Sequence, residues 1–328
     1  MTPQLHLITG GAGCIGSELA TALISAGHRV RVIDNLSSGR KEHVAHLMEC
    51  ENFDFHYGDV LDSGALRWAF LGKRRPQVPD MVWHLSCKTD IKLLDGAKEY
   101  GWESDYEQNL DATWYVLQEM RTLDVKRIAF CSSAAVYGNQ SVIDEDFLPE
   151  PVSMYGATKL ACEALIRVMA LRCEMQAWVF RFSSIVSPRF RTSGNMVIPD
   201  LINKLRKDPT RLEILGDGKQ TKPSLLVSDC VEAMQFIVKQ ANQPFNLFNL
   251  GAPDAISVTR QAELICEAMD FSPEFVYKVG GEGGGGWPGD VPSFRMRVAK
   301  LANLGWRTRH TSEEACRIAI AGLLESCK

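Results

Sequence analysis

The sequence of 328 residues predicts an α/β protein built on a doubly wound parallel sheet. Three observations support this fold class. Short apolar runs alternate with helical patterns, a glycine-rich turn follows the first apolar run, and polar residues recur where the expected strands end. Strands separated by crossover helices pair in parallel, and ligands of such sheets bind beyond the carboxyl ends of the strands.

The glycine-rich turn stands directly after the first expected strand. The chain runs in the order strand, turn, helix, strand and acid, at residues 5–9, 10–16, 17–26, 29–33 and Asp34. The turn has the spacing Gly10-x-x-Gly13-x-x-Gly16. Glycine lets the backbone turn tightly and approach a pyrophosphate, whose charge then meets the free N–H groups at the helix N-terminus. This order is typical of a Rossmann-like dinucleotide-binding domain.

Asp34 bears on the choice of dinucleotide. It ends the second strand, where a carboxylate accepts hydrogen bonds from the adenine-ribose hydroxyls and would repel a 2′-phosphate. The sequence therefore favours NAD over NADP, although two basic residues, Arg40 and Lys41, follow closely.

Strands and helices continue to alternate through the first half of the chain. Strands are expected at 53–57, 80–85, 126–131 and 176–181, and helices at 62–70, 106–121 and 152–172. Polar residues stand at several of the strand ends, among them Asp59, Ser86, Ser133 and Ser184. Because the carboxyl ends of parallel strands meet at one edge of the sheet, we expect one ligand site there.

Prolines and short elements after Arg181 indicate a smaller second region. It is expected to hold helices at 195–207, 258–269 and 312–324 and strands at 212–215 and 224–227. A helix at 229–240 and a strand at 245–250 are expected to return to the first region. We therefore assign 1–176, with 226–249, to an NAD-binding Rossmann domain, and 177–225 with 250–328 to a substrate-binding α/β domain.

Tyr155 and Lys159 are four residues apart in an expected helix, so their side chains share one face. An ammonium beside a phenol favours the phenolate, which lowers the tyrosine pKa from about 10. A tyrosine with such a lowered pKa can take a proton from a sugar or alcohol hydroxyl near neutral pH. The pair is therefore a candidate catalytic base with its activating cation.

Composition excludes several other classes of protein. The formal net charge of −4 provides no basic surface for nucleic acid. No apolar run approaches the ~20 residues that span a bilayer, and the first residues lack the pattern of a signal peptide. The ten cysteines include no Cys-x-x-Cys pair, so we expect free thiols in a reducing cytoplasm and no metal site.

Taken together, these motifs resemble those of the extended short-chain dehydrogenase/reductases. Within them the chain is similar to the NAD-dependent epimerase/dehydratase family, and in particular to its nucleotide-sugar 4-epimerases of the UDP-galactose (UDP-glucose) type. The resemblance covers nearly the full length and rests on the glycine triplet with Asp34-Asn35-Leu36-Ser37-Ser38-Gly39, Gly58-Asp59-Val60, Asn109, Ser132-Ser133 to Tyr137-Gly138, Tyr155-x-x-x-Lys159, Gly216-Asp217-Gly218-x-Gln220, Asn249-Leu250-Gly251 and Gly289-Asp290-Val291.

The resemblance implies a reaction and a catalytic triad. Tyr155 would remove the proton of the sugar C4 hydroxyl while hydride passes to NAD, which yields a transient 4-keto sugar. Return of the hydride to the opposite face would invert C4, and NAD would stay bound. Ser133 would hydrogen-bond the reacting oxygen, and Lys159 would hold the nicotinamide ribose and favour the phenolate.

The resemblance also implies two sets of binding residues. For the cofactor these are Gly10, Gly13, Cys14, Ile15, Gly16, Asp34, Asn35, Ser38, Asp59, Val60, Leu85, Ser86, Asn109 and Lys159. For the nucleotide-sugar substrate they are Ser133, Ser184, Asn195, Lys222, Trp287 and Asp290. A homodimer formed through the helices at 106–121 and 152–172 is usual in the family.

Two alanines narrow the choice of reaction within the family. Ala134 and Ala135 stand where related dehydratases have an Asp-Glu pair and related decarboxylases have a glutamate. Alanine supplies neither acid nor base, which argues against elimination and decarboxylation. Two alternatives stay open: a nucleotide-sugar 4-ketoreductase or dehydrogenase with exchangeable NAD(H), and a non-catalytic NAD-binding regulatory protein.

Departures from the family pattern cluster in the substrate half. Ser184 replaces a common asparagine, Lys222 replaces a common arginine, and Trp287 stands where many members have arginine. Lysine keeps the charge but loses the bidentate fork of arginine. These changes leave the nucleotide and the sugar undetermined. The stretch Gly280–Gly286 is read either as a flap that orders over the substrate or as a plain loop.

Overall fold

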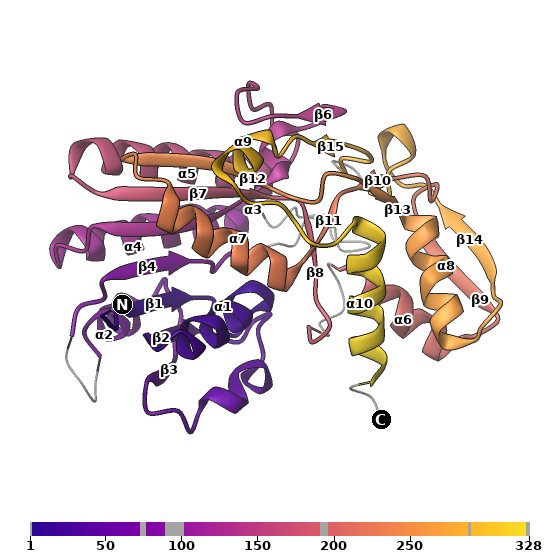
Figure 1. The fold of residues 1–328 in the computed structure, drawn as a ribbon. Coiled ribbons are helices and arrows are strands. Elements are labelled where there is room, and N and C mark those ends of the chain that lie inside the picture. The colour runs from indigo at the N-terminus through magenta and orange to yellow at the C-terminus, as the bar shows by residue number, and fades with distance from the viewer. Residues whose placement is uncertain (1, 73–76, 89–101, 191–195, 288–289, 326–328) are drawn as a thin grey trace.

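The computed structural model describes residues 2–72, 77–88, 102–190, 196–287 and 290–325. Its centre is a seven-stranded sheet in the order β12-β7-β5-β4-β1-β2-β3, in which every neighbouring pair is parallel (Figure 1). The strands are β1 (Leu5–Thr9), β2 (Arg29–Asp34), β3 (Phe53–Tyr57), β4 (Met81–His84), β5 (Arg127–Ser133), β7 (Gln176–Phe182) and β12 (Phe245–Leu250). The expected Rossmann-like sheet is thereby confirmed.

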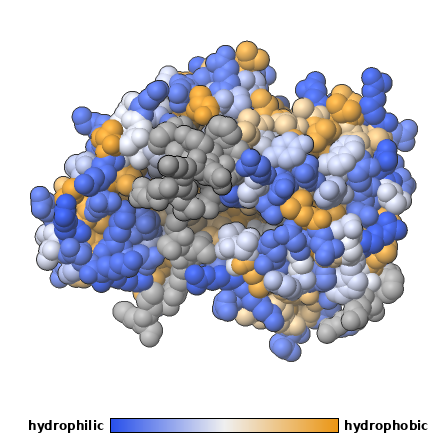
Figure 2. All heavy atoms as spheres, turned by 180° about the vertical axis from the view of Figure 1, so that it is seen from behind, coloured by the Kyte–Doolittle hydropathy of each residue, from blue (hydrophilic) through white to orange (hydrophobic). Residues whose placement is uncertain are grey.

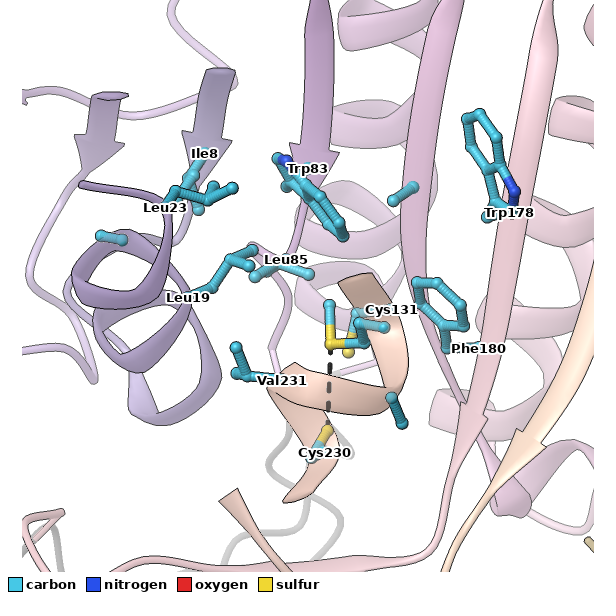
Figure 3. Close-up of a cluster of buried hydrophobic side chains, with 14 of the residues drawn as sticks. Ile8, Leu19, Leu23, Trp83, Leu85, Cys131, Trp178, Phe180, Cys230 and Val231 are labelled. Atoms are coloured by element: carbon cyan, nitrogen blue, oxygen red, sulfur yellow. Dashed lines mark hydrogen bonds between the residues drawn. The ribbon is translucent and has the colours of Figure 1, made fainter. Parts of the chain in front are cut away.

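Helices cover both faces of this sheet. On one face, α1 (Cys14–Ser25) and α7 (Val227–Gln240) pack on an apolar cluster that includes Ile8, Trp83 and Phe180, as Figure 3 shows. On the other face lie α2 (Ser63–Leu71), α4 (Ala112–Thr122) and α5 (Met154–Arg172). The strand order reverses between β1 and β4, and ligands of doubly wound sheets bind at this switch point.

Local sequence accounts for several element boundaries. Asp62 caps α2, because its side chain accepts hydrogen bonds from the N–H groups of Gly64 and Ala65. Ser153 caps α5 in the same way through the N–H of Gly156. The helix expected at 106–121 differs in form: it consists of α3 (Trp102–Asp105), the π-helical turn η2 (Tyr106–Asp111) and α4.

The second region holds pairs of short strands around a separate core. Its strand pairs are β8 (Ser184–Val186) with β11 (Ser224–Leu226), β9 (Arg211–Leu215) with β14 (Glu274–Lys278), and β10 (Thr221–Lys222) with β13 (Ile256–Ser257). A further strand, β15 (Arg295–Met296), pairs with β6 (Val142–Ile143) of the first region. Its helices are α6 (Val197–Lys207), α8 (Val258–Met269) and α10 (Ser312–Glu325). The sequence pattern located β9 and β11 but not their partners β14 and β8.

The two regions share part of their packing. Residues 226–249 form α7 and β12, which belong to the main sheet and its covering layer. Leu301 of α9 (Ala299–Leu304) and Trp306 also pack in that core, although they lie within the range 250–328 assigned to the second region.

The face shown in Figure 2 carries hydrophobic residues in scattered groups among hydrophilic ones. Within the described ranges, no helix has both the length and the apolarity that a bilayer crossing demands.

Candidate active site

A cavity of about 990 Å³ lies at the carboxyl ends of the strands, between the main sheet and the second region. Its size matches the upper end of the range for small-molecule sites, roughly 300–1,000 Å³. The expected catalytic residue Tyr155 lines it, as do nearly all of the residues expected to bind cofactor or substrate: Gly10, Gly13, Cys14, Ile15, Gly16, Asp34, Asn35, Ser38, Asp59, Val60, Leu85, Ser86, Ser133, Ser184, Lys222, Trp287 and Asp290.

The glycine turn forms a tight cradle at one end of this cavity. Gly10 has a positive φ of 70°, and a Cβ there would lie 2.8 Å from the Ser86 backbone. A Cβ on Gly16 would lie 2.3 Å from the carbonyl oxygen of Gly10. Both positions therefore require glycine. The helix α1 begins at Cys14, so its free N–H groups lie at the turn, where they can meet a pyrophosphate.

Asp34 joins the second strand to the cradle. One carboxylate oxygen accepts a hydrogen bond of 2.8 Å from the N–H of Ala12, and the other accepts one of 2.8 Å from the N–H of Leu36. Burial raises the pKa of Asp34, while these two N–H groups oppose the rise. Each oxygen keeps a second lone pair, so the carboxylate can hold the turn and still accept from a ribose hydroxyl.

Asn35 and Asp59 form the neighbouring part of the wall. Asn35 Nδ2 donates to Asp59 Oδ2 over 2.8 Å, and Asp59 Oδ1 accepts from the N–H of Leu61 over 2.9 Å. The two side chains thus fix each other across the ends of β2 and β3. This places a polar edge beside Asp34, where the adenine end of a dinucleotide would lie.

A chain of hydrogen bonds runs beneath the cavity from Ser86. Ser86 Oγ donates to Thr9 Oγ1 over 3.0 Å, and the His84 ring bridges Thr9 and Thr113 over 2.8 and 3.0 Å. Burial, reinforced by the charge of Lys159, lowers the pKa of His84 to about 3. The His84 ring is therefore neutral at physiological pH, and its role is to join Thr9 and Thr113 by hydrogen bonds rather than to donate a proton in catalysis.

Asn109 and Lys159 lie behind the wall rather than on it. The Asn109 side chain accepts from the N–H of Lys88 over 2.9 Å and donates to Thr158 Oγ1 over 3.2 Å. It joins the segment after β4 to α5 across the π-helical turn. Its expected contact with the cofactor stays a prediction, and a third expected residue, Asn195, lies outside the described residues.

Ser133 and Tyr155 meet on the cavity wall. Ser133 ends β5 and lies close enough to the Tyr155 phenol to lower its pKa, while its Oγ accepts from the N–H of Ala135 over 3.1 Å. Gly156 makes this approach possible, because a Cβ there would lie 2.5 Å from the carbonyl oxygen of Ala135. The first turn of α5 can therefore pack directly against the turn that follows Ser133.

The Lys159 ammonium lies one helical turn after Tyr155 in α5. Its Nζ donates to the Cys131 carbonyl over 2.8 Å and lies 5.8 Å from the centre of the Tyr155 ring. The expectation that Lys159 leaves the tyrosine with a lowered pKa is wrong for the chain by itself. Burial raises the pKa of Tyr155 more than the charge of Lys159 and the hydrogen bond from Ser133 lower it. A further positive charge in the cavity would favour the phenolate.

The substrate end of the cavity contains a second ion pair. Lys222 Nζ lies 2.8 Å from Asp290 Oδ1 and 5.8 Å from the centre of the Trp287 ring. Asp290 Oδ2 accepts from the N–H of Gly286 over 3.1 Å. Three of the expected substrate residues thus form one cluster, with Lys222 as its cation.

The glycine-rich stretch beside this cluster folds back on itself. The N–H groups of Gly280 and Gly281 both donate to the carbonyl of Gly285, and the N–H of Asp217 donates to that of Gly284. The stretch therefore continues the Gly216-Asp217-Gly218 turn through backbone hydrogen bonds. That this stretch moves as a flap over a substrate stays a prediction.

Several residues that the sequence analysis did not assign to the site also line the cavity. Cys87, Cys131, Gln108, Gln220 and Ser187 all contribute to its wall. The position of Cys87, directly after Ser86 at the end of β4, was a usable signal, because the residues after strand ends form the site.

Comparison with known proteins agrees with this geometry. A family model described as "NAD dependent epimerase/dehydratase family" matches residues 6–251. A putative UDP-glucose 4-epimerase of Methanocaldococcus jannaschii is 28% identical over 92% of both chains. A crystal structure of a UDP-galactose 4-epimerase is 31% identical, covers 99% of this chain and 100% of its own, and superposes with a TM-score of 0.83.

Relatives with another activity are similar as well. UDP-glucuronic acid decarboxylase 1 of Arabidopsis thaliana is 27% identical over 83% of this chain and 60% of its own. The chain belongs to the NAD-dependent epimerase/dehydratase family, within the extended short-chain dehydrogenase/reductases. NAD is its cofactor, and the glycine cradle with Asp34 fits that molecule. The reaction is less narrowly defined, because epimerases and decarboxylases both resemble the chain.

Proposed function

We propose that the protein interconverts a nucleotide-activated sugar and its C4 epimer, and we favour a sugar of the UDP-glucose/UDP-galactose type. The observation that carries the proposal is the contact of Ser133 with Tyr155 on the wall of the cavity that also holds the glycine cradle. Lys159 lies behind Tyr155. The same cavity thus offers a proton acceptor and a dinucleotide site.

Each member of the triad has a separate task in this reaction. Tyr155 takes the proton from the C4 hydroxyl and later returns a proton to the same oxygen. Ser133 Oγ holds the reacting oxygen, and Lys159 keeps positive charge near the phenolate. NAD, when bound, supplies the hydride acceptor and its positive charge. Positioning and tuning of the tyrosine pKa are therefore the contribution of the chain.

The turn after Ser133 supports epimerisation over elimination or decarboxylation. Ala134 and Ala135 form part of the 3₁₀ turn η3 (Ala134–Tyr137) that packs against α5. Neither side chain carries a group that moves a proton. The ion pair of Lys222 and Asp290 offers a cation for the diphosphate at the other end of the cavity.

A panel of UDP-sugars assayed without added NAD tests the proposal. Conversion of UDP-glucose to UDP-galactose, with NAD retained through gel filtration and recovered after denaturation, is the expected result. Net accumulation of NADH with added NAD would indicate the 4-ketoreductase or dehydrogenase alternative instead. Absence of any turnover with NAD bound would favour the regulatory alternative.

We also propose a homodimer and a reducing compartment. The helices α4 and α5 lie in contact, and both expose apolar residues: Trp114, Tyr115, Val168 and Leu171. An exposed apolar face of this kind is typical of an interface between subunits. The cysteines among the described residues are all free, which supports a cytoplasmic location.

A further inference from the structure

The buried ammonium of Lys159 needs a countercharge. Only 1% of the residue is exposed, and its Nζ lies over the Phe130 ring at 4.8 Å. Among the described residues, no carboxylate forms an ion pair with it. Glu163, the nearest acid along α5, is held by Arg181 over 2.7 Å and by Ser132. An uncompensated buried charge is costly, so another anion is required.

Cys87 is placed to be that anion. Its thiol lies on the cavity wall with Cys131, close enough to Lys159 and to the Cys131 thiol for both to lower its pKa. The titratable groups that face it are Cys131 on β5 and Lys159, Tyr155 and Cys162 on α5. Of these, Lys159 alone is a cation at neutral pH. Cys131 sits deeper, beside Leu85 and Phe180 in the apolar cluster of Figure 3.

The pKa values of the two thiols are shifted in opposite directions. The hydrogen bond from Cys131, aided by the charge of Lys159, lowers the pKa of Cys87 to about 6 against the effect of burial. The same hydrogen bond, together with burial, raises the pKa of Cys131 well above its ordinary value. One sulfur is therefore suited to be a thiolate at neutral pH, and its neighbour to stay protonated.

We propose that Cys87 is a modification site for hydroperoxides and soft electrophiles, with Cys131 as its resolving thiol. The Cys87 thiolate attacks a peroxide oxygen, the O–O bond breaks, and Cys87 sulfenic acid and hydroxide (or alkoxide) form. The Cys131 thiol then attacks the sulfenic sulfur, which forms a disulfide and releases water. Sulfur is oxidised and the peroxide is reduced, so no other reactant is needed.

Modification has a direct consequence for the cavity. It removes the anion that faces Lys159 and adds bulk, or an S–S bond, next to Ser86 on the cofactor wall. Weaker dinucleotide binding should follow. Conversely, a bound dinucleotide covers this wall and should shield Cys87.

Alkylation with iodoacetamide, followed by peptide mass spectrometry, tests the thiolate. In protein freed of NAD, the labelling rate of Cys87 should rise with a midpoint near pH 6, and restoring saturating NAD should slow it. Cys50, which is partly exposed and lies away from the cavity, is the internal control. At pH 7 Cys87 should react roughly fourfold faster than an ordinary thiol, since its lower nucleophilicity offsets part of its larger thiolate fraction. A midpoint near pH 9 would overturn the proposal.

Treatment with hydrogen peroxide tests the resolving step. We expect a peptide in which Cys87 and Cys131 are joined, and dithiothreitol should remove it. In Cys131→Ala, dimedone should instead trap the Cys87 sulfenic acid, with circular dichroism to confirm that the variant is folded. Should wild-type protein yield neither the joined peptide nor a dimedone adduct at Cys87, the modification site is refuted whatever reaction the enzyme catalyses.

Discussion

Lys222 Nζ donates a hydrogen bond of 2.8 Å to Asp290 Oδ1, which joins β10 to the segment after the glycine-rich stretch. The Asp290 side chain is 3% exposed and that of Lys222 29%, so the acid is buried and the cation borders the cavity. The pair orders the substrate end of the cavity across 68 residues of sequence.

Lys222→Met should raise KM for the nucleotide sugar more than it lowers kcat. The change removes a cation from the cavity and leaves Asp290 without its partner. A hydrogen bond to a charged group contributes about 1.5–3 kcal/mol, which corresponds to a change in KM of roughly 10–150-fold. Steady-state kinetics measure this, with Lys219→Met, an exposed lysine of the same turn, as the control. An equal effect of both variants would contradict the assignment.

Tyr155→Phe should lower kcat by about 10²–10⁴-fold and leave NAD bound. The variant keeps the ring that fills the wall but loses the group that moves the proton. Turnover and the NAD content of the denatured protein are the two measurements. Tyr115→Phe, a change at a partly exposed tyrosine of α4, should behave like the unmodified protein. Full activity of Tyr155→Phe would refute the catalytic assignment.

Glu163→Gln should destabilise the protein by about 3–5 kcal/mol, because it leaves the Arg181 guanidinium buried without its acid. The Arg181 side chain is 4% exposed and that of Glu163 is 6% exposed. The guanidinium donates to Oε1 and Oε2 of the carboxylate over 3.0 and 2.7 Å. Urea unfolding measures the loss. Glu119→Gln, which breaks the more exposed pair with Arg67, should cost less than about 1 kcal/mol. Comparable losses in the two variants would show that Arg181 finds another partner.

Stability should fall as pH falls below 6.5, in part through His6. Burial, aided by the charges of His28 and Arg127, lowers the pKa of His6 to about 3. Between pH 6.5 and 3 the unfolded chain therefore binds a proton at this site that the folded chain does not. The free energy of unfolding loses about 1.4 kcal/mol per pH unit from this group. In His6→Gln, urea unfolding from pH 6.5 to 5 should show a correspondingly smaller slope, and an unchanged slope would contradict the assignment.

Leu171→Glu should convert a dimer to a monomer in sedimentation velocity. Leu171 is 59% exposed on α5, next to the exposed Val168, so a charge there would be buried in the proposed interface. Leu148→Glu, at a residue that is 73% exposed outside both helices, should leave the assembly unchanged. A monomeric wild-type protein would refute the homodimer directly.

The sequence by itself determined the main elements and the cofactor end of the site. The expected strands 5–9 and 53–57 coincide with β1 and β3, and the glycine turn, Asp34 and Asp59 lie together at one edge. These features were readable because periodicity, capping and glycine spacing are local properties of the chain. In a parallel sheet, the places where strands end then indicate which residues meet.

The tertiary structure alone decided the substrate end and the electrostatics. The pair of Lys222 and Asp290, the short strands of the second region and the contact of Cys87 with Lys159 join segments far apart in sequence. The Tyr155 pKa shows the same limit. Spacing along α5 predicts the cation that lowers the Tyr155 pKa. Burial by distant parts of the chain raises that pKa by a larger amount. Desolvation depends on every segment that excludes water, and no local pattern reports it.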